Sequence, residues 1–150
     1  MKEKLIVYNR KAKHDYFLQD FYEAGMVLVG TEIKSIREGK VQIRDGYISI
    51  INNEVYIKNM NVSHYSHGNQ FNHEELRERK LLLHRSEIKK LSQKIKQEGF
   101  TIVPIRIYLK GGKVKIEIAT AKGKKLFDKR HSEKVKDNQR MIQRAIKNYR

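Results

Sequence analysis

The side chains best able to do chemistry are cations gathered near the end of the chain. Residues 121–150 hold 11 Lys or Arg and 3 Asp or Glu, and the resulting +8 is half of the +16 carried by all 150 residues. Charge this dense repels itself unless a polyanion neutralises it, and nucleic acid is the commonest intracellular polyanion of that size. Leu126, Phe127 and Asp128 are interleaved with the cations. A merely solvated tail is the alternative, but it has no use for such side chains.

Other kinds of reactive site are not indicated. Three histidines lie within residues 64–73, but Arg77 follows His73 at the place where a helical zinc-protease motif needs a second histidine. The chain has no cysteine, which excludes disulfides, Cys-type zinc sites and a thiol nucleophile. Gly123-Lys124 lacks the rest of a phosphate-binding loop, and no carboxylate pair is evident. We therefore expect no metal, no cofactor and no catalytic residue.

The elements that must position these cations are mainly short strands between residues 15 and 121. Two hairpins are predicted, because pairs of β-branched and aromatic runs flank residues that tolerate positive φ. Their strands are 47–51 with 54–60 around Asn52-Asn53, and 100–109 with 114–119 around Gly111-Gly112. A further apolar run covers 26–29, and Pro104 predicts a strand edge or a bulge because it cannot donate to a ladder. Five to seven such strands indicate a mainly β fold, a closed or partly closed barrel.

Two short helices are predicted at the periphery of the barrel. One covers 31–37 and ends near Gly39. The other covers 86–98, with Ser86 as N-cap, an apolar stripe at every third or fourth residue, and Gly99 at its end. The polar stretch 64–85 between them is predicted to be a long loop that enters the core at its leucines.

Composition divides the chain into a barrel over residues 1–120 and a basic C-terminal tail over 121–150. In the tail, Val135, Ile142, Ile146 and Tyr149 fall on one side of a helical pattern. This stripe is thin, and an isolated helix of such length is marginal in water. We expect the tail to be disordered alone and helical against a partner.

Length and hydropathy bound the remaining possibilities. A chain of 150 residues can build one hydrophobic core and an appendage. The first apolar run is too short for a signal peptide, and no segment approaches the ~20 apolar residues of a membrane span. We expect a cytoplasmic protein with no membrane partner, and a monomer.

Six ordered stretches carry a resemblance to a known family. They cover residues 9–12, 14–16, 23–25, 30–37, 79–84 and 121–130. From about Ile6 onward the chain resembles the small protein B family, the tmRNA-binding (SsrA-binding) proteins of bacterial trans-translation. The resemblance implies an OB-like barrel with peripheral helices. It also implies binding of the tRNA-like domain of tmRNA and its delivery to ribosomes stalled without a stop codon. There the protein would stand in for the missing anticodon arm, with its tail in the vacant decoding site and mRNA channel of the small subunit.

For the barrel, the resemblance implies a set of RNA-binding residues. These are Asn9, Lys11, Lys13, His14, Tyr16, Glu23, Lys34, Arg37, Leu82 and Lys115. The first five combine phosphate donors with an aromatic ring. Glu23 would accept from base or 2′-OH donors, orient a nearby cation, or be structural. Core packing remains the alternative for Tyr16 and Leu82.

For the tail, the resemblance implies ribosome-binding residues in two clusters. They are Gly123, Lys124, Lys125, Phe127, Asp128, Lys129 and Arg130. The cations suit ribosomal RNA phosphates, and Gly123 lets the backbone approach closely. Phe127 stands where relatives often carry His or Tyr, so stacking on a base is kept while a hydrogen bond is lost.

Two other functions remain open at this point. One is a ribosomal or assembly protein that binds structured ribosomal RNA constitutively. The other is an RNA-modifying enzyme whose catalytic residues the pattern does not reveal. Stoichiometric co-purification with ribosomes would favour the first, whereas co-purification of one short RNA species would favour the tmRNA-binding reading.

Overall fold

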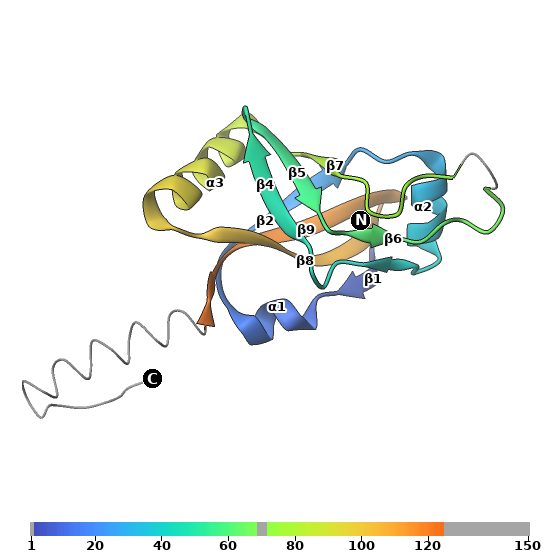
Figure 1. Cartoon of the computed structure of the whole chain (residues 1–150), viewed down its shortest axis with the longest axis horizontal. Helices are drawn as coiled ribbons and strands as arrows, with labels where there is room; N and C mark the ends of the chain where they lie inside the picture. The colour runs from blue at the N-terminus through green and yellow to red at the C-terminus, as the bar shows by residue number, and fades with distance from the viewer. Residues whose placement is uncertain (1, 69–71, 125–150) are drawn as a thin grey trace, which may run out of the picture.

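A computed structural model of the chain describes residues 2–68 and 72–124 (Figure 1). Its strands are β1 (Glu3–Tyr8), β2 (Tyr16–Met26), β3 (Val41–Gln42), β4 (Tyr47–Ile51), β5 (Glu54–Lys58), β6 (Asn61–Val62), β7 (Arg79–Leu82), β8 (Thr101–Lys110) and β9 (Lys113–Gly123). Its helices are α1 (Arg10–Asp15), α2 (Gly30–Arg37) and α3 (Arg85–Glu98). The predicted tail helix lies outside the described residues.

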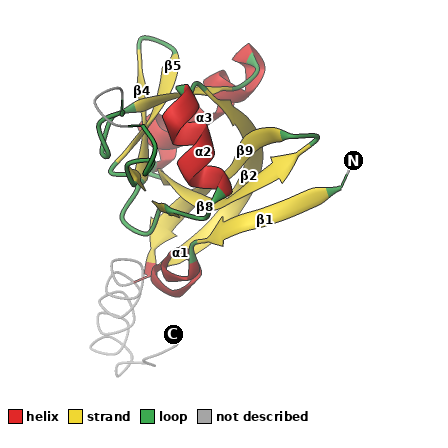
Figure 2. Ribbon diagram, turned by 90° about the vertical axis from the view of Figure 1, so that its right-hand side faces the viewer, coloured by secondary structure: helices red, strands yellow, loops and turns green. Residues whose placement is uncertain are grey.

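Seven of the strands form one antiparallel sheet in the order β1-β8-β9-β2-β7-β5-β4, and β3 pairs with β6 in a small second sheet. The sheet curls around its interior (Figure 2), and β4 packs against β8. The mainly β prediction is confirmed. Of the two predicted forms the closed one is not found, because within the described residues no hydrogen-bonded pairing joins the end strands β1 and β4.

Both predicted hairpins are present, and their turns explain them. Asn52 and Asn53 have φ of 52° and 63°, the left-handed conformation that a tight two-residue turn between twisted strands requires. Gly111 and Gly112, with φ of 60° and 78°, do the same between β8 and β9. Pro104 lies in β8, an interior strand, and the register with β9 shifts between Pro104 and Arg106. The bulge that the proline predicted is therefore present, and Pro104 lies just outside the stretch of β8 that pairs with β1, which ends at Arg106.

Several elements differ from the sequence prediction. The helix α1 and most of β2 were not predicted, and the apolar run 26–29 is the end of β2 and the link to α2. The predicted loop 64–85 contains β7, which pairs with both β2 and β5. The third helix begins after His84 rather than Ser86, because the Glu87 carboxylate accepts a hydrogen bond of 3.0 Å from the His84 backbone N–H.

Two hydrophobic clusters hold the fold together. The larger lies inside the curled sheet, where Ile36 of α2 and Leu91 of α3, both fully buried, pack on the strands. The smaller lies on the other face of β8 and β9, beneath Ala12 of α1. Because β8 is covered on both faces at this end, residues 102–105 are all buried. This part of β8 therefore lacks the alternation of apolar and polar residues that marks a strand with one exposed face.

The C-terminal end of β9 crosses the predicted boundary between the barrel and the tail. This strand continues beyond residue 120 to Gly123, and Ala121 is fully buried in the smaller cluster. The first three residues of the compositional tail are therefore part of the sheet.

Among the residues that the structure describes, no helix is long and apolar enough to cross a membrane.

A buried ion pair fixes α2 against β7. Arg79 Nε and Glu32 Oε2 lie 2.6 Å apart with both side chains fully buried, and Arg77 Nη2 lies 2.6 Å from Glu32 Oε1. Burial alone would raise the pKa of Glu32, but hydrogen bonds from Arg77, the Val29 N–H and Arg79 hold that pKa below its usual value. These two arginines, which the sequence placed in a polar loop, are structural.

Candidate RNA interface

Helix α1 presents the first group of predicted residues at the surface. Lys11, Lys13 and His14 are exposed on it. The Lys11 ammonium lies 3.1 Å from a carboxylate oxygen of Asp45, and the Lys13 ammonium lies 5.7 Å from the centre of the Tyr8 ring. Both pairings are at the surface, where such contacts are weak and exchange readily with a phosphate. The group therefore offers two cations and an imidazole to an anionic partner.

Asn9 supports this group from beneath. Its side chain is 5% exposed, and its amide donates hydrogen bonds to the Pro104 carbonyl at 2.8 Å and the Ile43 carbonyl at 3.4 Å. Its Oδ1 accepts from the Ala12 N–H at 3.2 Å, which caps α1. The amide donors are thus committed inside the protein. Asn9 therefore positions α1 on the bulge of β8, and the RNA contact predicted for it stays a prediction.

Tyr16 lies between the core and the surface. It is half-buried and packs against the smaller hydrophobic cluster, so core packing, left open by the sequence, accounts for one side of its ring. It pairs with Gly123 at the start of the β2–β9 ladder. Part of the side chain stays accessible beside α1.

A second group surrounds a shallow cavity of about 360 Å³ at the other end of β2. Lys115 of β9, Gly25 of β2 and Leu82 of β7 are direct cross-strand neighbours, so they share one face of the sheet. Leu82 is 53% exposed, which excludes the core role left open for it. Arg37 of α2 completes the lining and is held there by a 3.0 Å hydrogen bond from Nη2 to the Gly112 carbonyl.

Gly25 keeps this cavity open. A Cβ at this position would lie 3.5 Å from Leu82 Cβ and 3.8 Å from Lys115 Nζ. The glycine therefore leaves a gap between an exposed apolar side chain and a cation. Lys34, one turn before Arg37, points elsewhere: its ammonium lies 5.4 Å from the centre of the Tyr65 ring. Although Lys34 and Arg37 are three residues apart on α2, only Arg37 lines the cavity.

Glu23 lies next to this cavity and is fixed by partners. Tyr108 Oη donates a short hydrogen bond to Glu23 Oε2, and the Lys110 ammonium lies 3.3 Å from the same oxygen. The hydrogen bond from Tyr108 is the main cause of a Glu23 pKa below its usual value, with further contributions from Lys110 and Lys115. Glu23 is therefore charged at neutral pH and presents its other oxygen as an acceptor.

Tyr108 is held in place for that contact. The side chain is 1% exposed, and the Arg106 guanidinium stacks 4.1 Å from the centre of its ring. Burial, followed by the bond to Glu23, raises the pKa of Tyr108, so its hydroxyl remains a donor. Arg106 also pairs with Glu117 at 3.1 Å, which offsets the repulsion between Glu117 and its cross-strand neighbour Glu23.

One strand links the two groups. Tyr16 and Gly25 are nine residues apart in β2, a separation of roughly 30 Å at the usual rise of a strand. Phe21 and Glu23 lie between them on the same face, and Phe21 is 49% exposed. Most of the predicted residues therefore lie on one elongated surface along the β2–β9 ladder. We call it the β2 face; it comprises Lys11, Lys13, His14, Phe21, Glu23, Gly25, Arg37, Leu82 and Lys115.

Some residues of this surface were missed by sequence reasoning. Arg44 lines a cavity together with Arg10, Lys11 and His14, although it is far from these three residues in the sequence. Phe21 was missed because most of β2, the strand that carries it, was not predicted. Only the fold brings these residues to the predicted ones.

The start of the tail rests on the body. Lys124 Nζ lies 5.4 Å from the centre of the Phe17 ring, and Lys122 Nζ lies 4.7 Å from that of Phe100. Gly123 ends β9. The other predicted tail residues lie outside the described residues; they are Lys125, Phe127, Asp128, Lys129 and Arg130.

The chemistry of the β2 face is that of a binding surface. It carries cations for phosphates, a charged acceptor and exposed apolar groups. Within residues 2–68 and 72–124 no cluster of His, Cys, Asp or Glu is arranged to hold a metal ion. His73, the histidine closest to a metal motif in sequence, is buried and bonded to Thr31 Oγ1 and the Val62 carbonyl, each at 2.8 Å.

Comparison with known proteins assigns the family. A family model described as SmpB protein matches residues 6–148. The SsrA-binding protein of Geobacillus thermodenitrificans is 51% identical over 144 residues, which cover 96% of this chain and 93% of the relative. That of Caldanaerobacter subterraneus subsp. tengcongensis is 53% identical over 144 residues, covering 96% and 91%. A solved structure described as "tmRNA-SmpB: a journey to the center of the bacterial ribosome" is 40% identical with a TM-score of 0.67, covering 79% of this chain and 83% of the other. The resemblance found in the sequence is confirmed, and the chain belongs to the SmpB protein family.

Proposed function

We propose that this protein binds the tRNA-like domain of tmRNA and delivers it to stalled ribosomes in the cytoplasm, as an adaptor in trans-translation. The names of its relatives support the RNA partner, because they are SsrA-binding proteins. The related structure, whose description places tmRNA and SmpB in the bacterial ribosome, supports the second partner. The proposed activity is binding and delivery, which requires no chemical step of any residue.

The observation that carries the proposal is the row formed by Lys115, Gly25 and Leu82 beside Arg37 and Glu23. Folded RNA is recognised largely by its shape, its phosphates and its 2′-hydroxyls, or by bases that are turned outward. Lys115 and Arg37 would pair with phosphates, while Leu82 and the open space above Gly25 would receive a base or ribose. Glu23, charged and fixed by Tyr108, would accept from a 2′-OH or a base donor.

At the far end of the β2 face, α1 would make a separate contact. Lys11, Lys13 and His14 would bind phosphates, and Arg10 and Arg44 would reinforce them. Phe21, in between, offers a ring on which a base can stack. A contact surface roughly 30 Å long, at the usual strand rise, suits a folded RNA arm better than a short oligonucleotide.

On the ribosome, we propose that the body stands in for the anticodon arm that tmRNA lacks and that the tail enters the vacant decoding site and mRNA channel. The composition of residues 121–150 supports this, since a +8 segment needs a polyanionic surface. The contacts of Lys122 and Lys124 with aromatic rings support a fixed starting point for the tail. The remaining tail would order on the ribosome only when the channel is empty.

The RNA that co-purifies with the protein tests this function directly. Sequencing it from a purification at low salt should give one dominant short species, tmRNA. Stoichiometric recovery of ribosomal RNA at every stage of growth would instead support a constitutive ribosomal or assembly protein. A purification of a Lys115→Ala, Arg37→Ala variant serves as the control and should lose the short RNA.

A further inference from the structure

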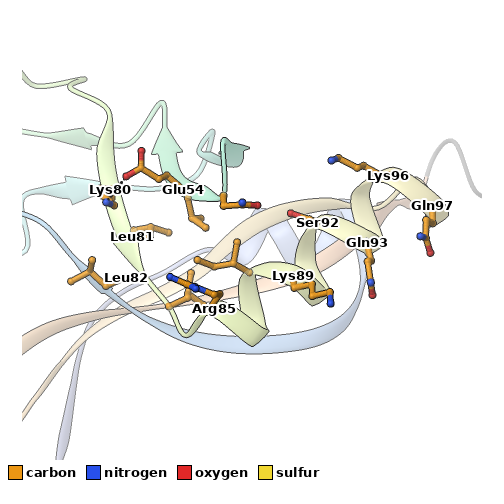
Figure 3. Close-up of a pocket in the computed structure, with 14 residues that line it drawn as sticks. Glu54, Lys80, Leu81, Leu82, Arg85, Lys89, Ser92, Gln93, Lys96 and Gln97 are labelled. Atoms are coloured by element: carbon orange, nitrogen blue, oxygen red, sulfur yellow. Dashed lines mark hydrogen bonds and ion pairs between the residues drawn. The ribbon is translucent and has the colours of Figure 1, made fainter.

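A groove beside α3, on the side of the molecule away from α1 (Figure 1), is drawn in close-up in Figure 3. Its cavity measures about 1020 Å³ and lies between α3 and the strands β5 and β7. Figure 3 shows the side chains of α3 arranged along one wall and Lys80, Leu81 and Leu82 along the other. We call this cavity the α3 groove.

The charge of the lining points to an anionic ligand. The lining contains four cations, Lys80, Arg85, Lys89 and Lys96, and one carboxylate, Glu54. Glu54 Oε2 is 2.6 Å from Lys80 Nζ, so these two charges offset each other. The other three cations are exposed along α3. A concave surface lined by one sign of charge focuses the field and attracts polyanions.

The spacing of the lining residues suits an extended ligand rather than a small one. Arg85, Lys89, Gln93 and Gln97 are each four residues apart, so they form one row along the helix. At 1.5 Å per residue this row is about 18 Å long. It presents two cations followed by two amides. Cations bind phosphates, and amides can donate to and accept from ribose hydroxyls and base edges.

Leu82 connects the groove with the β2 face. It lines both the α3 groove and the cavity of Arg37 and Lys115, and it is 53% exposed. An RNA strand that runs from Lys115 across Leu82 would therefore enter the α3 groove directly. This continuity, together with the charge, favours RNA over an acidic protein segment as the occupant.

We propose that the α3 groove holds a further segment of the same tRNA-like RNA that lies over Lys115 and Leu82. Arg85, Lys89 and Lys96 bind its phosphates, and Gln93 and Gln97 contact its sugars or bases. The inference rests on the proposed function. It adds a second contact region on the opposite side of Leu82 and extends the interface around the barrel.

A charge-matched pair of variants tests the groove. Arg85→Gln, Lys89→Gln and Lys96→Gln are combined in the groove variant. Lys2→Gln, Lys4→Gln and Lys40→Gln are combined in the control, which removes the same charge from exposed positions outside both cavities. Surface substitutions of this kind change stability little. Affinity for a transcript of the tRNA-like domain is then measured at several salt concentrations.

We expect the groove variant to lose more than 10-fold in affinity at low salt. Its log–log salt dependence should become shallower by about 2, since each phosphate contact contributes ~0.7 to 0.9. The control should stay close to the wild type. Equal behaviour of the two variants would overturn the groove assignment alone. Failure of the wild-type protein to bind the transcript would overturn the proposed function and this inference with it.

A directed cleavage experiment locates the RNA. Since the chain has no cysteine, Gln93→Cys carries the only thiol and can be labelled with an iron chelate that cleaves nearby RNA. We expect its cuts in the tRNA-like transcript to adjoin those from Lys113→Cys, whose probe lies at the Lys115 cavity. Cuts from Gln93→Cys that do not adjoin those from Lys113→Cys, or no cuts in the transcript at all, would contradict the proposal.

Discussion

At the scale of single residues, RNA binding by the β2 face is proposed to depend on side chains that are held in place rather than on the number of cations. Gly25 is the clearest case, because its lack of a side chain creates the space between Leu82 and Lys115. Tyr108 is a second case, since it touches no solvent yet fixes Glu23. Each makes a prediction that a simple count of charges would not make.

Gly25→Val should weaken RNA binding without unfolding the protein. The position lies in β2 with no positive φ, and Val favours strands, so the backbone accepts the change. The added methyl groups fill the gap between Leu82 and Lys115. We expect at least a 10-fold loss of affinity for the tRNA-like RNA with an unchanged melting temperature. Gly25→Ala, whose Cβ makes ordinary contacts, is the control and should lose much less.

Tyr108→Phe should change the titration of Glu23. The hydrogen bond from Tyr108 lowers the pKa of Glu23 in the folded state, so it stabilises the protein at neutral pH, and this contribution is lost as pH falls through that pKa. We expect roughly 1 kcal/mol of destabilisation at pH 7, at the low end because the carboxylate is partly exposed. The difference from wild type should vanish in acid.

Carboxyl NMR resonances check this assignment. The Glu23 pKa should rise toward its ordinary value in Tyr108→Phe. A Glu23→Gln background is the control, since there the Tyr108 substitution should no longer produce a pH-dependent difference. An unchanged Glu23 titration in Tyr108→Phe would mean that the hydroxyl does not position the carboxylate.

At the scale of elements, the two hairpins were predictable from the sequence, whereas α1, β7 and most of β2 were not. Asn52-Asn53 and Gly111-Gly112 fix their hairpins locally, because their backbone conformation is a property of the residues themselves. The helix α1 is only six residues long and depends on the Asn9 cap and on Ala12 packing against β8 and β9. Such tertiary support leaves no periodic signal in the sequence.

The candidate site was predicted in the same uneven way. The resemblance supplied Glu23, Leu82 and Lys115 as separate positions, and only strand pairing makes Leu82, Gly25 and Lys115 neighbours. The structural role of Asn9 was not predictable, because burial, which commits its amide, cannot be read from a polar stretch. Arg79 is a residue type that often binds RNA, yet in the interior it donates to the carboxylate of Glu32, 47 positions away in the chain.

Arg79→Ala should destabilise the protein strongly. It would leave the buried Glu32 carboxylate without its inner partner and the Met60 carbonyl without a donor. Breaking a buried ion pair costs about 3–5 kcal/mol. Urea unfolding of Arg79→Ala and of the control Arg77→Ala measures this, because Arg77 shares the same carboxylate but is partly exposed. Equal losses for both variants would refute the distinction.

At the scale of the whole molecule, the body and the tail are proposed to have separate tasks. Deletion of residues 125–150 keeps β9 intact, including the contact of Lys124 with Phe17. The truncated protein should therefore retain most of its affinity for tmRNA. It should fail to support peptide tagging on ribosomes with an empty mRNA channel.

The triple variant Asp128→Ala, Lys129→Ala, Arg130→Ala narrows this test. It should reproduce the tagging defect of the deletion while binding tmRNA almost normally. Both variants are assayed with the same purified ribosomes, and RNA binding serves as the internal control for folding. Normal tagging by the truncated protein would show that the tail is a solvated appendage with no role on the ribosome.

The central claim is that the β2 face binds the tRNA-like domain of tmRNA through Lys115 and its neighbours. The most direct measurement is the affinity of the full chain for that RNA across a salt series, with Lys115→Ala beside the charge-matched control Lys40→Ala. With about five phosphate contacts at ~0.7 to 0.9 ions each, the β2 face alone should contribute about −4 to the wild-type log–log slope. Lys115→Ala should lose one such increment and roughly 1.5–3 kcal/mol of binding, while Lys40→Ala should not. A slope shallower than about −1, or equal affinities for the two variants, would contradict the account.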